Sequence, residues 1–275
     1  MEKYSGIFRQ WMSFRRRLME RRGDESRGLG GTSRTTVRNA MLVMLSLAAG
    51  CVDAVGLLGL GQIFVANMTG NTVLLGLALG QAEARAALRA VVALVGFIVG
   101  VAVGAAILGP GRERSTWPPG VTAALALELV VLIAFAIGWF FAESEPAGLT
   151  VYPLILLPAV AMGLQSAAVR RMGIPGVATT YITGTLTDLT EGAIARLRPA
   201  VSATIPDGRG EERPEQRRPS ARGLLLPADV WLAYGIGAVI VGILTLRWPS
   251  GVLSVPVAVL ALVVAIAVAR FRDQW

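Results

Sequence analysis

Two short stretches hold most of the polar residues that could do chemistry. Residues 62–76 contain a Thr-Gly pair among amides and hydroxyls, and residues 177–189 repeat this pattern less closely. Each stretch adjoins a long apolar span, and lipid cannot satisfy an exposed backbone, so such segments usually line a protected cavity. We therefore expect a site for a small polar solute or an ion. The candidates are Asn67, Thr69, Gly70, Asn71, Thr179, Thr180, Thr183, Gly184, Thr187 and Asp188.

Asp53 lies inside the first apolar span. At about 1.5 Å per residue it is roughly 18 Å deep, near the middle of a core about 30 Å thick. A carboxylate there costs at least ~2.5 kcal/mol, so it should face a cavity or a partner. Lost hydration disfavours the charged form, which makes Asp53 a candidate proton or cation site. Alternatively, it bonds to Asn67, Thr69 or Asn71 and only holds the broken segment in place.

Two further polar residues lie within spans. Gln165 occupies the matching place in the second half, where its amide could bind a solute or join neighbouring helices. Glu128 is a second carboxylate, which we place nearer the end of its span. It could reach the interface, pair with an arginine such as Arg112, or take part in transport.

Composition limits the possible functions. Hydrophobic residues make up 54% of the chain and charged residues 16%, which indicates a polytopic membrane protein. With one cysteine and no histidine, zinc-type sites, Cys/His pairs and Ser-His-Asp triads are excluded. We expect no enzyme activity, no metal and no cofactor. The net charge of +8 comes from residues at span ends and tails, which favours contact with membrane lipids over nucleic acid.

The expected fold is an all-α bundle with about six transmembrane helices and two broken Thr-Gly segments, 64–80 and 176–195. The predicted spans are 40–60, 88–109, 120–142, 151–169, 225–246 and 251–269. The order of a span, a Thr-Gly segment and two more spans occurs in 40–142 and again in 151–269, which predicts a two-fold internal repeat. A face formed by Gly96, Gly100 and Gly104 predicts helix packing, within the subunit or in a homo-oligomer.

Charge placement distinguishes two topologies. If both Thr-Gly segments return to the side they came from, six crossings leave only Arg85, Arg89 and Arg247 outside, three of the 26 basic residues. If both cross fully, the positive-inside rule is obeyed less well. We therefore favour six crossings with both termini cytoplasmic, in a bacterial inner membrane. The second half is then inverted relative to the first, as in many secondary transporters.

Three segments lie outside the spans. Residues 1–39 are a basic cytoplasmic tail, which either places a short amphipathic helix on the membrane or remains a solvated arm. Residues 196–223 are rich in proline and charge, which predicts a flexible cytoplasmic linker within the transmembrane domain 40–269. Residues 270–275 form the C-terminus.

The motifs resemble those of the YoaK-like family of bacterial inner-membrane proteins, a domain of unknown function. The first half carries the resemblance in 49–54 and 64–71, and the second half in 163–167 and 179–188. Ser166 stands where the family pattern usually has a second amide. The resemblance covers about 40–269 and implies about six spans, but it implies no activity.

The leading functional hypothesis is a secondary transporter or permease for a small solute, with Asp53 coupling it to a proton or cation. Its site would lie between the two halves. The alternative is a membrane scaffold or sensor that acts through the basic tail and the linker.

Overall fold

The computed structural model describes residues 34–110, 115–142, 148–174, 179–180, 182–197 and 221–272. The predicted tail and most of the predicted linker lie outside these residues. The chain divides into two compact units, Met1–Ala40 and Met41–Trp275. The described residues of the first unit are helical, and there the Arg38 guanidinium donates to the side-chain amide oxygen of Asn39 at 3.1 Å.

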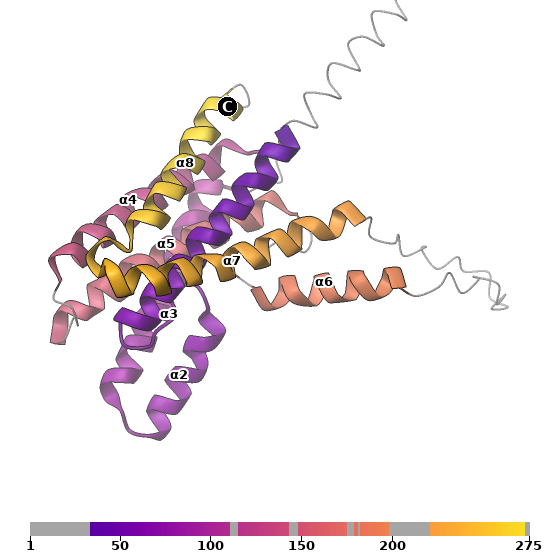
Figure 1. Cartoon of the computed structure of the whole chain (residues 1–275). Coiled ribbons are helices and arrows are strands. Elements are labelled where there is room, and N and C mark those ends of the chain that lie inside the picture. Colours follow the sequence, from indigo (N-terminus) through magenta and orange to yellow (C-terminus); the bar gives the residue numbers. More distant parts are fainter. Residues whose placement is uncertain are drawn as a thin grey trace, which may run out of the picture. The chain divides into compact units, whose positions relative to one another are not determined.

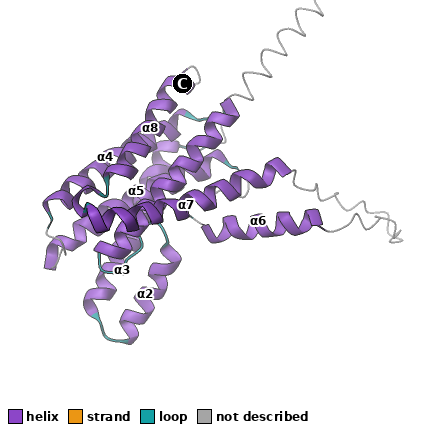
Figure 2. Cartoon of the chain, viewed as in Figure 1, coloured by secondary structure: helices purple, strands orange, loops and turns teal. Residues whose placement is uncertain are grey.

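The part of the chain that the structure describes contains helices and loops and no strand, which confirms the all-α class (Figure 2). Six helices are long and apolar enough to cross a membrane, as predicted. The helices are the first helix (Arg34–Gly59), α2 (Met68–Gly80), α3 (Ala84–Leu108), α4 (Pro119–Phe141), α5 (Val151–Met172), α6 (Ile182–Leu197), α7 (Ala221–Arg247) and α8 (Ser254–Phe271), with short 3-10 turns at Gly148–Thr150 and Pro249–Gly251 (Figure 1).

Each broken segment is interrupted before its Thr-Gly pair. Gly70 lies in the first turn of α2 and Gly184 in the first turn of α6, so both pairs are helical. The irregular backbone of the first segment therefore lies just before its Thr-Gly pair, at 60–67. The 13 residues of α2 span about 20 Å, which is short of a bilayer core of about 30 Å.

One end of the second unit is defined by contacts around Trp139, and we call it the Trp139 end. The Trp139 ring packs on Gly59, where an added Cβ would lie 2.2 Å from the ring, and its indole N–H donates to the Pro249 carbonyl at 3.0 Å. Two residues beyond Gly59, an added Cβ at Gly61 would lie 2.1 Å from Nη1 of Arg89, near the start of α3. The first helix and α4 therefore end where α3 and α8 begin.

The opposite end, which we call the Trp117 end, gathers the other helix termini. The Arg171 guanidinium donates to the Leu108 carbonyl at 3.0 Å, so α3 and α5 end together. The Trp117 ring, just before α4, stacks on Phe271 of α8 with centroids 5.5 Å apart. Trp117 is buried, because this stacking and a hydrogen bond from its indole N–H to the Thr122 hydroxyl hold it inside the bundle.

These contacts determine the path of each broken segment. The first helix ends and α3 begins at the Trp139 end, so residues 60–83 start and finish there. In the second half, α5 ends at the Trp117 end. Because α8 starts at the Trp139 end, α7 finishes there and begins at the Trp117 end. The helices that flank α6 thus meet at the opposite end from those that flank α2, and α6 packs along α7 (Figure 1).

Glycines allow two pairs of helices to approach to backbone contact. An added Cβ at Gly50 would lie 2.1 Å from the Tyr234 carbonyl oxygen of α7, and one at Gly237 would lie 2.2 Å from that of Leu47. Between α3 and α5, an added Cβ at Gly100 would lie 2.1 Å from the Val160 oxygen.

The contact between α3 and α5 is equally close from the side of α5, since an added Cβ at Gly163 would lie 2.3 Å from the Phe97 carbonyl oxygen. The Gly96, Gly100 and Gly104 face is thus used for packing on α5 within the subunit.

Candidate functional site

Asp53 is buried and fastens the first broken segment to the first helix. One carboxylate oxygen accepts from the backbone N–H groups of Val65 and Ala66, both at 2.6 Å. The other accepts from the hydroxyl of Tyr234 on α7. Asp53 lies six residues before the end of its helix, so the chain after Gly59 has returned about 9 Å along the helix to reach it. A side chain of 3% exposure therefore joins three parts of the molecule.

Asn71 and Asn67 complete the local structure of this segment. The amide of Asn71 donates to the Phe64 carbonyl at 2.6 Å and accepts from the Phe64 N–H at 3.0 Å, as a neighbouring strand would. Asn67 caps α2 by accepting from the Gly70 N–H at 3.2 Å. The two asparagines thus satisfy backbone groups that lipid could not, which leaves them less free to bind a solute.

The turn after the first helix depends on two left-handed residues. Gly61 has φ +79° and Gln62 has φ +63°, and Gln62 adopts this conformation without being a glycine. The Arg89 guanidinium lies against Gly61, two residues past the C-terminal end of the first helix, an end at which a positive charge is favourable.

Gln165 plays the corresponding part in the second half. Its amide nitrogen donates to the Thr179 hydroxyl at 2.8 Å and to the Leu45 carbonyl at 3.2 Å, and it is fully buried. Thr179 precedes α6 by as many residues as Val65 precedes α2. The carbonyl oxygen of Gln165 has no hydrogen-bond partner among the described residues. Gln165 therefore joins the first helix, α5 and the second broken segment, with one acceptor unused.

The structure does not gather all the predicted candidates. Thr69 is exposed on α2, and Thr183, Thr187 and Asp188 are exposed on α6. The Thr187 hydroxyl donates to the Thr183 carbonyl of its own helix, at 3.0 Å. Thr180 and Gly184 are half-buried. Gly70 matters for close packing, since an added Cβ would lie 2.8 Å from the Phe64 ring.

Two polar residues within the spans, Tyr234 and Glu128, differ from the expectation drawn from the sequence. Tyr234 was not singled out, although a hydroxyl in the middle of an apolar span was a signal of the same kind as Asp53. Glu128 was placed near a helix end, yet it lies nine residues after the start of the 23-residue α4 and is fully buried. It therefore cannot reach the interface, and Arg112 lies outside the described residues.

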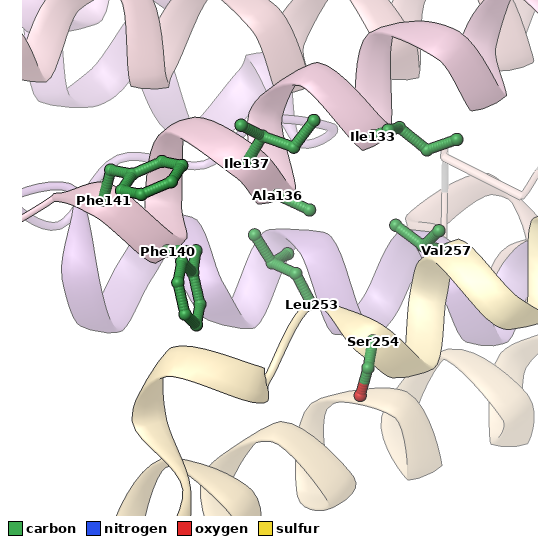
Figure 3. A pocket seen from close by; sticks show the side chains of 8 residues that line it. All are labelled: Ile133, Ala136, Ile137, Phe140, Phe141, Leu253, Ser254 and Val257. Atoms are coloured by element: carbon green, nitrogen blue, oxygen red, sulfur yellow. The ribbon is translucent and has the colours of Figure 1, made fainter.

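Two hollows in the surface are apolar and lie apart from these residues. One of about 260 Å³ is formed by α4 and the start of α8, with Ile137, Phe140 and Leu253 in its walls (Figure 3). The other, of about 330 Å³, lies between α3 and α5 beside Tyr152. Neither is lined by a predicted site residue, so their chemistry suits hydrocarbon rather than an ion.

Comparison with known proteins places this arrangement in a family. A family model described as "Protein of unknown function (DUF1275)" matches residues 41–266. The chain is 36% identical over 206 residues to the UPF0700 transmembrane protein YoaK of Bacillus subtilis (strain 168), which covers 75% of this chain and 83% of that protein. No solved structure matches the chain. The chain is thus a multi-pass membrane protein, and it belongs to the DUF1275 family.

Proposed function

We propose that this protein is a secondary transporter for a small polar solute in the bacterial cytoplasmic membrane, with both termini cytoplasmic. The observation that carries the proposal is the pair of broken segments, which fold back from opposite ends of the bundle toward buried polar residues. In secondary transporters, sites form where such segments from two inverted halves meet near the middle of the membrane.

The helix contacts support an internal two-fold repeat. In the first pair of equivalent helices, Gly50 and Leu47 of the first helix are separated by the same number of residues from Gly163 and Val160 of α5. In the second pair, Gly100 and Phe97 of α3 are separated by one common number of residues from Gly237 and Tyr234 of α7. The first helix therefore crosses α7 through residues equivalent to those by which α5 crosses α3. The polar contacts correspond less closely: Asp53 and Gln165 each bind the residue three before their short helix, but the separation that relates Gly50 to Gly163 pairs Asp53 with Ser166.

The first contribution of Asp53 to this function is to connect the two halves through hydrogen bonds. It belongs to the first half, whereas Tyr234 belongs to the second, and its bonds to Val65 and Ala66 hold the broken segment between them. Protonation of this carboxylate would weaken all three bonds, because a neutral carboxyl accepts less strongly than a carboxylate. A proton could in this way release the segment, which retains the coupling role predicted for Asp53.

Distances between spin labels at the two ends test the proposal. In a Cys51→Ser background, one label pair would replace Leu58 and Trp248 at the Trp139 end, and another would replace Arg170 and Arg272 at the Trp117 end. A transporter alternates between states open at either end. We therefore expect two distances for each pair, and a change of pH that lengthens one should shorten the other. A single, unchanged distance at both ends would instead favour a rigid scaffold.

A further inference from the structure

Glu128 is a buried carboxylate with no hydrogen-bond partner among the described residues. Both its oxygens are buried, and neither accepts a hydrogen bond from any residue that the structure describes. An isolated charge in such a place is costly unless a proton or a cation neutralises it. It lies on the stripe of α4 that continues through Leu132 and Phe135 to Trp139, and the Trp139 ring contacts the first helix at Gly59. This face of α4 therefore points into the bundle.

Two helix registers place Glu128 at the depth of Gln165. An added Cβ at Gly138 would lie 3.1 Å from the Leu154 side chain, and α4 and α5 run in opposite directions. Ten residues along each helix, about 15 Å, lead from this contact to Glu128 and Leu164. Along the first helix, eleven residues back from the Trp139–Gly59 contact lead to Ala48, about one turn from the Leu45 carbonyl that Gln165 binds.

Within the described part of the chain, the buried side-chain groups left unpaired at this depth are all acceptors. They are the two oxygens of Glu128 and the carbonyl oxygen of Gln165. None of these oxygens carries a hydrogen, so a hydrogen bond between any two of them requires an added proton. We propose that Glu128 is a proton-binding site and that Gln165 accepts the hydrogen bond of the protonated carboxyl group. The use of this proton to drive transport rests on the function proposed above, whereas the binding itself does not.

Other titratable groups also lie on the surrounding helices. They are Arg34, Arg38, Cys51 and Asp53 on the first helix, Arg85 and Arg89 on α3, Tyr152, Arg170 and Arg171 on α5, and Arg270 at the end of α8. None makes a hydrogen bond to Glu128 in the described part of the chain. Three of these groups have other partners. Asp53 accepts three hydrogen bonds, the Cys51 thiol donates to the Gly237 carbonyl oxygen at 3.4 Å, and the Arg171 guanidinium donates to the Leu108 carbonyl oxygen.

Infrared difference spectroscopy of the full-length protein in lipid nanodiscs would test the proton site. As the pH rises past the range in which exposed carboxyl groups ionise, the carbonyl bands that remain should come from buried protonated carboxyl groups. We expect Glu128→Gln to remove one of these remaining bands, whereas Asp53→Asn and Glu191→Gln, which alters an exposed carboxylate, should leave that band in place. Glu128→Gln should fold, since it removes a buried unpaired charge.

A second variant tests the part played by Gln165. Gln165→Met keeps a similar volume but removes the acceptor, so the band should persist at a shifted frequency. Retention of the band in Glu128→Gln would overturn the assignment to Glu128, and an unshifted band in Gln165→Met would overturn the pairing. Loss of the wild-type band on adding sodium chloride at constant pH would show that the site binds a metal cation instead. If Glu128→Gln removed the band but the spin-label distances did not change with pH, the proton site at Glu128 would be supported and the transport proposal would be refuted.

Discussion

We expect Gly237→Ala to lower the stability of the folded protein more than the same substitution at any other described glycine of α7. The new Cβ would lie 2.2 Å from the Leu47 carbonyl oxygen and 3.0 Å from the Cys51 nitrogen. Both are backbone atoms, so neither can rotate away, and the two helices must separate. Overpacking of this kind costs about 1–3 kcal/mol, occasionally more. The melting temperature in detergent should fall accordingly.

A matched control lies two residues away in the same helix. An added Cβ at Gly235 meets nothing within 4 Å, so Gly235→Ala should be neutral or stabilising, because alanine favours a helix by about 1 kcal/mol over glycine. Gly100→Ala should cost about as much as Gly237→Ala if the two crossings are equivalent. Equal melting temperatures for Gly237→Ala and Gly235→Ala would mean that α7 does not approach the first helix this closely.

Asp53→Ala is expected to release the first broken segment from the first helix. The substitution leaves the N–H groups of Val65 and Ala66 buried without an acceptor, at a cost of about 1–3 kcal/mol for each. Hydrogen exchange in peptides covering 60–67 should therefore become faster, while exchange in α8 changes little. Mass spectrometry of the exchanged protein measures both regions at once.

Two milder variants separate the bonds of Asp53. Tyr234→Phe removes only the hydroxyl that donates to Asp53, and Asp53→Asn keeps an oxygen for the two N–H groups. Each should speed exchange in 60–67 by less than Asp53→Ala does. If Asp53→Ala left the exchange of 60–67 unaltered, the carboxylate would not be what holds the segment, and a role confined to ion binding would become the better interpretation.

The sequence was sufficient for the fold class because lipid imposes strict rules on apolar length and on buried charge. Six spans and the helix-packing face of α3 follow from these rules, and the structure confirms both. The cost of a buried carboxylate also predicted that Asp53 would have partners. Those partners are two backbone N–H groups and the Tyr234 hydroxyl rather than the predicted side chains. The return of the chain that brings the N–H groups to Asp53 depends on Gln62, a left-handed residue that is not a glycine.

Residues that act across long sequence separations were harder to predict. Gly237 is one of several glycines in α7, and nothing in its neighbours reveals that it faces Leu47 rather than lipid. The depth of Glu128 depends on where α4 begins, and its orientation depends on which helices cover it. Periodicity predicts which face of a helix is buried but not which helix packs against that face, so neither contact can be predicted from the sequence.

The central claim is that the two broken segments return to the ends they came from, on opposite sides of the membrane. Single cysteines at Gln62, Gln81, Arg170 and Ser220, in a Cys51→Ser background, test it by labelling intact cells with an impermeant maleimide. Positions 62 and 81 should label together, and positions 170 and 220 should both be protected. Labelling at only one of 62 and 81, and at only one of 170 and 220, would mean that the segments cross the membrane, which would contradict the inverted arrangement and the transport proposal built on it.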